Sequence, residues 1–317
     1  MDHGKPKVLL PCSSSPVQRL DIYLTTRSNP LLDSIDEIQD KLTASQYIVD
    51  RSLATAIFVA LKLKKPLFLE GEAGVGKTEV AKVLTRVFDT RLIRLQCYEG
   101  LDVNNAVYEW DYTRQLLEIR LLEAEGASRQ SARQNIFSEE FLLKRPLLQA
   151  IEDHSDRASV LLIDELDRAD EEFESFLLEL LSDWQITIPE LGTVRAKLPP
   201  IVIITSNRTR EIHDALKRRC IYHWIDFPSF EKELQIVEAK TPGINQELAR
   251  QIVAFVQELR KQDLYKLPGI AESLDWAQIL TTMGHEKLDE QIIKDTLGVL
   301  VKYQVDVQKV ANSSLIK

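Results

Sequence analysis

The sequence predicts an α/β fold, in which a parallel sheet is flanked by helices, followed by a small all-helical domain. Short apolar runs typical of buried strands alternate with segments that have a helical apolar period. After Pro228 the chain contains only helical patterns, so we place a boundary there. The predicted organisation is an N-terminal lead-in at 1–40, an α/β core at 41–228 and a helical domain at 229–317.

Each part has its own signature. Prolines in the lead-in favour partly extended chain, and Gly192 lies within alternating residues that predict a hairpin at about 185–199. In the helical domain the last predicted helix covers about 288–310. The elements expected in the core are a helix at 47–65, a strand at 66–70, a helix at 77–89, strands at 91–97 and 159–165, a helix at 171–184, and strands at 201–206 and 221–227.

Composition narrows the classes of function. The net charge of −9 disfavours nonspecific binding to nucleic acid. The three cysteines are widely spaced, which argues against a disulfide framework or a thiolate metal site and favours a cytoplasmic protein. No apolar stretch approaches the roughly 18–20 residues needed to span a bilayer, so we expect no membrane insertion.

The strongest motif is GEAGVGKT, which follows the strand at 66–70 and opens a helix. Glycines let backbone N–H groups turn inward around a phosphate, and the following helix points its positive end at the anion. Lys77 would neutralise phosphate charge, and the Thr78 hydroxyl would ligate Mg²⁺. The predicted nucleotide-binding residues are Gly71, Glu72, Ala73, Gly74, Val75, Gly76, Lys77, Thr78 and Glu79.

The second motif is LLIDELD at 161–167, a buried strand that ends in acids. The carboxyl ends of parallel strands meet beside such a loop. We expect Asp164 to join Thr78 in the metal shell and Glu165 to be the catalytic base for an attacking water. Alone, these residues could also be an acidic strand end before a solvated helix, and we expect the acidic run Glu171–Glu174 to be a solvated helix face.

Two further signals are weaker. Asn207 ends the strand at 201–206 and could place a water against a terminal phosphate, or it could be a simple turn residue. Arg218 and Arg219 in ALKRRC could reach the nucleotide of a neighbouring subunit, or they could be a solvated basic helix end.

Together, these motifs resemble the AAA+ ATPases and, in detail, the MoxR group. EGEAGVGKTEVA, LLIDELDRAD, IVIITSN and DALKRRC carry that resemblance. YEWDYTRQLLEIRL and PGIAESLDWAQIL resemble the CoxD-type subgroup, which is linked to carbon monoxide dehydrogenase maturation. The resemblance covers roughly residues 40–285.

The resemblance implies a role for each position. Lys77 and Thr78 match Walker A, Asp164 and Glu165 match Walker B, and Asn207 matches sensor 1. Arg219 matches the arginine finger better than Arg218. The resemblance also implies ATP and Mg²⁺ as cofactors, and protruding elements in an insert at about 105–140 and the hairpin at 185–199.

Partners are likewise implied by the resemblance. The chain would form a ring with copies of itself, usually a hexamer, with ATP between subunits. It would act as a chaperone-like remodelling factor that helps mature, or insert metal into, a client enzyme. A von Willebrand factor A domain protein would be its co-partner.

The sequence departs from the family pattern at sensor 2, where the segment Gly269–Ser273 has no arginine and Ala271 stands at the expected place. Either another basic residue contacts the terminal phosphate, or the coupling between nucleotide and lid is weaker. Arg168 could be that residue, or it could pair with Asp170 or Glu172.

The alternating aromatic residues Tyr108, Trp110 and Tyr112 are expected on one face of an extended segment. They would form either a satellite hydrophobic cluster or a partner-gripping loop.

Two other functions compete with a remodelling ATPase. One is a nucleic-acid machine such as a helicase or loader, against which the net charge of −9 argues. The other is a switch that binds ATP without hydrolysis, against which the intact Glu165 argues.

Overall fold

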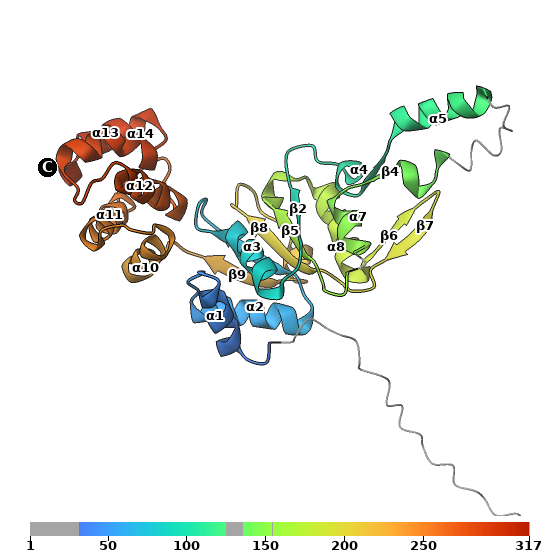
Figure 1. The fold of residues 1–317 in the computed structure, drawn as a ribbon, viewed down its shortest axis with the longest axis horizontal. Helices are drawn as coiled ribbons and strands as arrows, with labels where there is room; N and C mark the ends of the chain where they lie inside the picture. The colour runs from blue at the N-terminus through green and yellow to red at the C-terminus, as the bar shows by residue number, and fades with distance from the viewer. Residues whose placement is uncertain (1–31, 125–135, 154, 317) are drawn as a thin grey trace, which may run out of the picture.

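A five-stranded parallel sheet organises the first part of the molecule, with strand order β2-β5-β8-β1-β9 (Figure 1). The structure is a computed structural model that describes residues 32–124, 136–153 and 155–316. Because all neighbouring pairs are parallel, the carboxyl ends of the strands meet at one edge. The strands are β1 (Leu67–Gly71), β2 (Leu92–Gln96), β5 (Val160–Asp164), β8 (Ile201–Ser206) and β9 (Ile221–Ile225).

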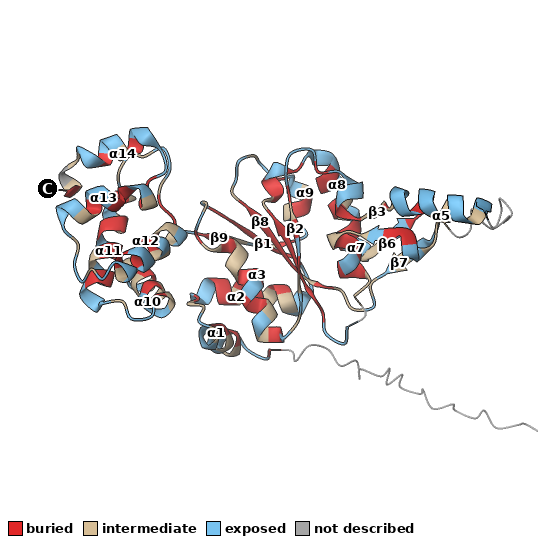
Figure 2. Ribbon diagram, turned by 45° about the horizontal axis from the view of Figure 1, so that its top comes forward, coloured by how far each residue is buried: buried red, intermediate tan, exposed pale blue. Residues whose placement is uncertain are grey.

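Helices cover both faces of the sheet, and buried residues concentrate along the central strands and the inner helix faces (Figure 2). Because helices cover both faces, β1 and β5 are buried along their whole length, including the carboxylates of Glu70 and Asp164 near their carboxyl ends. One face carries α1 (Ile35–Ala44), α2 (Arg51–Leu63) and α3 (Lys77–Phe88). The other carries α7 (Pro146–Ile151), α8 (Glu171–Asp183) and α9 (Asp214–Lys217).

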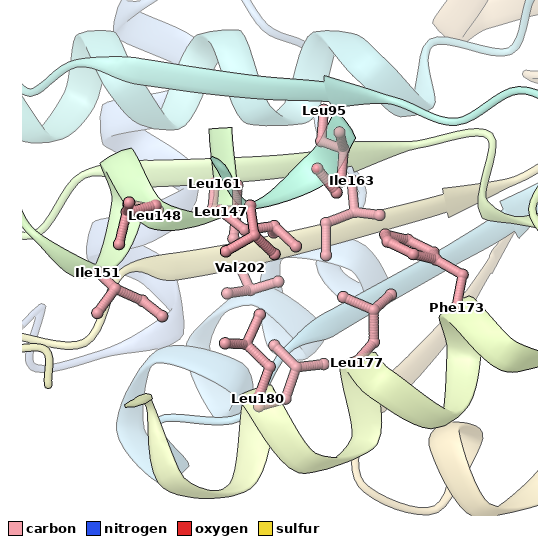
Figure 3. Close-up of a cluster of buried hydrophobic side chains, with 14 of the residues drawn as sticks. Leu95, Leu147, Leu148, Ile151, Leu161, Ile163, Phe173, Leu177, Leu180 and Val202 are labelled. Atoms are coloured by element: carbon pink, nitrogen blue, oxygen red, sulfur yellow. The ribbon is translucent and has the colours of Figure 1, made fainter. Parts of the chain in front are cut away.

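The alternation of side chains along β5 joins the two layers. Leu161 and Ile163 pack toward α7 and α8, whereas Val160 and Leu162 pack on the opposite face. Figure 3 shows Phe173, Leu177 and Leu180 of α8 pointing into the cluster of buried side chains that includes Leu161 and Ile163. Burying each such side chain stabilises the fold by about 1.5–3 kcal/mol, and the resulting rigidity holds the strand ends in place.

Two smaller antiparallel pairs extend from the core (Figure 1). In the first, β3 (Tyr108–Trp110) pairs with β4 (Leu142–Lys144), between α4 (Val103–Ala106), α5 (Tyr112–Ala124) and η1 (Glu139–Phe141). In the second, β6 (Gln185–Ile188) pairs with β7 (Gly192–Arg195) around the expected hairpin turn.

The helices after Pro228 have their own hydrophobic core. Trp276 lies at its centre, fully buried, and donates a hydrogen bond from Nε1 to Thr296 Oγ1 at 2.8 Å. The helices are α10 (Phe230–Lys240), α11 (Gln246–Leu259), α12 (Ile270–Thr282), α13 (Glu290–Leu300) and α14 (Gln304–Ala311), followed by the turn η3 (Ser314–Ile316). We refer to this part as the lid.

Several local expectations were wrong. Residues 35–40 are helical and not extended, because Ser34 caps α1 and Ile38 packs into the core; residues 1–31 lie outside the described residues. The single helix predicted at 288–310 is two helices, because the chain extends at Val301, which is buried in the lid core.

The three aromatic residues do not share one face. Tyr112 begins α5 and is 64% exposed, whereas Trp110 is buried and stacks edge-on with Tyr108 at 6.3 Å between ring centroids. The insert expected at 105–140 includes residues 125–135, which lie outside the described residues.

Candidate active site

A cavity of about 480 Å³ opens at the carboxyl edge of the sheet, between the core and the lid. The loop after β1 forms one wall from Ala73 to Glu79, and Asp164, Glu165 and Asn207 form another. Lid residues that include Lys240, Ile270 and Ala271 close the opposite side. Of the predicted nucleotide-binding residues, Gly71 and Glu72 lie behind this wall and do not line the cavity.

The glycines of the loop have a steric reason. A Cβ on Gly71 would lie 2.2 Å from the carbonyl oxygen of Ile225 on β9, so no side chain fits there. Gly76 has a φ of 96° at the N-cap of α3, where an L side chain would be strained. Gly71 therefore allows the loop to pass close to β9, and Gly76 allows the turn that leads into α3, so that the backbone can curve around a bound phosphate.

Lys77 is folded against the loop. Its Nζ donates hydrogen bonds to the carbonyl oxygens of Gly71 at 2.8 Å and Glu72 at 2.7 Å. Burial lowers the pKa of Lys77, although nearby carboxylates oppose this shift. A buried ammonium group held by carbonyls at the cavity wall is suited to bind a polyphosphate.

Asp164 is a junction of hydrogen bonds at the end of β5. Its Oδ1 accepts from Thr78 Oγ1 at 3.0 Å and from Thr205 Oγ1 at 2.6 Å. Its Oδ2 accepts from Arg94 Nε at 3.0 Å and Nη2 at 2.5 Å. Thr78 and Asp164, the expected metal-shell pair, are therefore in direct contact, and their oxygens suit Mg²⁺.

Glu165 has a left-handed backbone conformation, with φ 56° and ψ 51°. Its amide donates to Thr205 Oγ1 at 2.9 Å, and its Oε2 accepts from Gln96 Nε2 at 3.1 Å and Arg168 Nη1 at 3.3 Å. Left-handed non-glycine residues cost about 1–3 kcal/mol and cluster at functional sites. Arg168 thus pairs with Glu165, and not with Asp170 or Glu172 as one alternative predicted.

Asn207 lines the same cavity from the end of β8. Its backbone amide donates to Asp167 Oδ1 at 3.1 Å, and Thr209 donates to Asp167 Oδ2 at 2.9 Å. Asp167 is only 2% exposed, so it fixes the loop that carries Asn207.

A second buried acid holds the same loop. Glu174, 1% exposed, forms an ion pair with Arg210 and accepts from the His213 amide at 2.8 Å. The expectation that the run Glu171–Glu174 is wholly solvated was therefore wrong at Glu174.

The predicted arginine pair lies outside the cavity. Arg219 donates from Nη1 to the carbonyl oxygen of Leu178 and to Ser182 Oγ, the latter at 2.6 Å, so it rests on α8 of its own chain. Arg218 is exposed and makes no side-chain hydrogen bond or ion pair within the described part of the chain.

The lid meets the phosphate loop through backbone contacts. The amide of Ile270 donates to the Gly74 carbonyl oxygen at 2.9 Å. A Cβ on Gly269 would lie 2.7 Å from Gly74 Cα, so only glycine permits this approach. Ala271, which stands at the expected sensor 2 place, lines the cavity without a charge, and two lid lysines, Lys232 and Lys240, belong to the same lining.

Four contributors to this site were missed by sequence reasoning: Arg94, Gln96, Thr205 and Asp167. Two of the four, Gln96 and Thr205, could have been found from the sequence, because they lie near the carboxyl ends of two recognised strands. Register places Gln96 opposite Asp164.

Part of the chain matches a model of a known protein family. Residues 66–220 match the AAA domain of the dynein-related subfamily. Similar curated proteins include uncharacterized proteins of Staphylococcus aureus, that of strain COL among them. They are 25% identical over 247 residues, covering 74% of this chain and 85% of the relative.

Solved structures are similar at lower identity. The RuvB Holliday junction branch migration motor of Thermotoga maritima has 16% identity and a TM-score of 0.45, covering 85% of this chain and 73% of that chain. A presumed ATPase of Cytophaga hutchinsonii has 15% identity and a TM-score of 0.46, covering 86% of both chains.

None of the helices in the described residues combines the length and the apolar character that crossing a membrane requires.

Proposed function

We propose that this chain, which has an AAA domain at residues 66–220, is an ATP-hydrolysing remodelling factor. One observation carries the proposal: Glu165 lies on the same cavity as the phosphate loop, next to Asp164 and Asn207. A protein that only bound nucleotide would need the loop but not a carboxylate in this position. The family match supports nucleotide hydrolysis in general.

The residues divide the work by their positions. Lys77 would leave the loop carbonyls for the phosphates, and the loop amides would bind phosphate oxygens. Thr78 and Asp164 would hold Mg²⁺, whose charge stabilises the charge that develops during phosphoryl transfer. Glu165 would orient and deprotonate the attacking water, and Asn207 would hold that water in line.

Hydrolysis is proposed to be completed by a neighbouring copy in a homo-oligomeric ring, as a hexamer. The turn that carries Arg218 and Arg219 lies at the surface after α9, where an arginine can reach another subunit. Such a finger is worth about 10³–10⁵ in rate. We assign this role to Arg219, which its contacts with α8 hold in one orientation.

The cellular role follows from the MoxR and CoxD-type resemblance. We propose that the chain acts in the cytoplasm as a chaperone-like factor for maturation or metal insertion in a client enzyme, together with a von Willebrand factor A domain protein. The Ile270–Gly74 hydrogen bond supports only the remodelling step of this proposal, because it links the loop directly to the lid.

The test of the enzyme is phosphate release by the wild type and Glu165→Gln. We expect the variant to bind ATP but to release phosphate at least about 10²-fold more slowly. Glu172→Gln, an exposed acid at the start of α8, is the matched control and should behave like the wild type. Equal rates in wild type and Glu165→Gln would refute hydrolysis at this site.

Subunit mixing tests the shared site. Glu165→Gln lacks a catalytic base but keeps its finger, and Arg219→Ala has the reverse defect. Their mixture should regain activity that neither variant has alone. Recovery with Arg218→Ala but not with Arg219→Ala would transfer the role to Arg218. The stalled Glu165→Gln ring is also the bait for identifying the client by pull-down.

A further inference from the structure

Glu70, the residue before Gly71, carries a carboxylate into the interior. It is 4% exposed, and its Oε2 accepts a hydrogen bond from the Tyr222 hydroxyl at 2.9 Å. Its Oε1 is buried and accepts no hydrogen bond from the described residues. Buried polar atoms almost always have partners, so this exception requires an explanation.

Lys217 is the cation next to this oxygen. Its Nζ lies 4.0 Å from Glu70 Oε1, which is beyond hydrogen-bonding range, and 3.2 Å from Glu211 Oε2, to which it donates. Glu211 is mostly exposed. The lysine therefore lies between two carboxylates, bonded to the exposed one and close to the buried one.

The chain positions of these residues connect two sites. Glu70 precedes the phosphate loop directly, and Glu211 lies on the loop that begins at Asn207. Lys217 is the last residue of α9 and directly precedes Arg218. One side chain thus contacts segments from both sides of the nucleotide cavity and leads into the turn that would face the next subunit.

We propose that Lys217 is a positioning residue that couples nucleotide occupancy in its own subunit to the placement of the Arg218–Arg219 turn for the neighbour. It does so by exchanging Glu211 for Glu70. The inference rests on the proposed function, since it assigns a regulation to that same site.

The exchange leaves no carboxylate stranded. When Lys217 moves to Glu70, Glu211 keeps Arg208, whose Nη2 lies 3.5 Å away. Glu70 gains a partner for its bare oxygen and retains Tyr222. Burial raises the pKa of Tyr222 to about 12, with the Glu70 hydrogen bond contributing, so the hydroxyl keeps its proton near neutral pH.

Such an arrangement has two near-balanced states. Closer contact with Glu70 strengthens the Coulomb attraction but removes the ammonium group from water. A small shift of the phosphate loop on binding ATP can therefore change the preferred state, because only differential interactions shift a two-state equilibrium.

The experiment compares full-length wild type, Lys217→Met, Lys217→Arg and Glu70→Gln. We measure ATP affinity, KM and kcat for phosphate release, the melting temperature, and trypsin cleavage after Arg218 and Arg219 with and without ATP. Lys217→Met and Glu70→Gln should keep KM within about twofold but lose about tenfold or more in kcat. Lys217→Arg should restore most of the loss.

Cleavage reports the turn directly. In the wild type, ATP should change the rate of cleavage after Arg218 and Arg219, and in Lys217→Met and Glu70→Gln this response should disappear at unchanged ATP affinity. Wild-type kcat and a wild-type cleavage response in Lys217→Met would overturn the inference. So would a kcat loss that follows a lowered melting temperature, which indicates a merely structural role.

The outcome separates this inference from the proposed function. If wild type and Glu165→Gln release phosphate equally slowly, hydrolysis fails. The cleavage response needs only ATP binding, so it still decides whether Lys217 moves the turn.

Discussion

Two buried carboxylates, Asp164 in the core and Glu233 in the lid, are each bound by an arginine, but their surroundings differ. Glu233 is fully buried and its partner Arg260 has a side chain only 6% exposed. Asp164 has a side chain 4% exposed, whereas that of Arg94 is 51% exposed.

The lid pair is closed. Arg260 donates to both oxygens of Glu233, at 2.6 and 2.8 Å, while Gln257 and Ser273 donate at 2.7 Å each. Arg260 also lies over the Phe227 ring and donates to the Pro268 carbonyl oxygen. This network joins α10, α11 and α12 to the segments around Phe227 and Pro268, which precede α10 and α12. It therefore sets where the first turn of α12 meets the phosphate loop.

The core pair is open. Arg94 can move into water, and the other contacts of Asp164 come from hydroxyl groups that line or adjoin the cavity. Both carboxylates are buried, so the two pairs differ in the exposure of the arginine. Arg94 can therefore leave Asp164 for water when a ligand approaches, whereas moving Arg260 would leave Glu233 buried without its cation.

The largest expected effect breaks the closed pair. Arg260→Met leaves a buried carboxylate without its cation and should lower the free energy of unfolding by about 3–5 kcal/mol. Urea denaturation measures it. Glu258→Gln on the same helix removes an exposed pair with Lys261 and should change that free energy by less than about 1 kcal/mol. Similar losses in both variants would contradict the distinction.

The second effect removes the charge of the open pair. Asp164→Asn retains an oxygen for Thr78 and Thr205 but loses the carboxylate that we propose for the metal shell, so phosphate release should fall about 10²-fold or more. Titration calorimetry should show unchanged ATP binding without Mg²⁺ and no gain when Mg²⁺ is added. Asp183→Asn, an exposed acid at the end of α8, is the control. Mg²⁺-enhanced binding in Asp164→Asn would remove Asp164 from the metal shell.

A third, smaller effect sharpens the comparison by removing only the cation. Arg94→Gln should lower the Mg²⁺ concentration needed for half-maximal ATP binding by several-fold, because the guanidinium no longer neutralises Asp164. The exposure of Arg94 limits the gain to roughly 1 kcal/mol. A lower Mg²⁺ concentration at half-maximal binding would support competition between Arg94 and Mg²⁺ for Asp164. A higher concentration would mean that Arg94 chiefly orients Asp164.

The same contrast explains what sequence could predict. The loop at 71–78 is one continuous stretch of sequence, and so is the acidic pair at 164–165. Each comes at the end of a recognisable strand, so the local sequence pattern was enough to predict the fold class and to propose these residues as the site. Arg94 and Thr205 act only because β2, β5 and β8 are neighbours in register. Strand order was not predicted, and so neither were these contacts.

Ion pairs between buried charges far apart in the sequence could not be predicted from the sequence either. Glu174 reads as one more acid in a solvated run, and only the fold brings Arg210 to it. Glu233 and Arg260 occupy ordinary positions on two helical patterns, and their partnership depends on how those helices pack.

The smallest expected effect concerns Lys232, which pairs with Asp50 across the core and the lid at 2.8 Å. Burial alone would raise the pKa of Asp50, but hydrogen bonds from Lys232, Ser52 and the Leu53 amide hold it below its ordinary value. Both side chains are partly exposed, so Lys232→Met should lower the free energy of unfolding by at most about 1 kcal/mol.

The contribution of the Lys232–Asp50 pair to the free energy of unfolding depends on pH. A carboxylate with a lowered pKa in the folded state stabilises the protein above its unfolded pKa of about 4, and that stabilisation is lost as pH falls through the folded value. The difference between wild type and Lys232→Met, measured by urea denaturation, should therefore be full at pH 7 and shrink below about pH 4. Lys240→Met, on the same helix and facing the cavity, is the control and should show no such trend. A difference that did not shrink on acidification would mean that Lys232 stabilises the protein through contacts other than Asp50, since those contacts do not depend on the charge of this carboxylate.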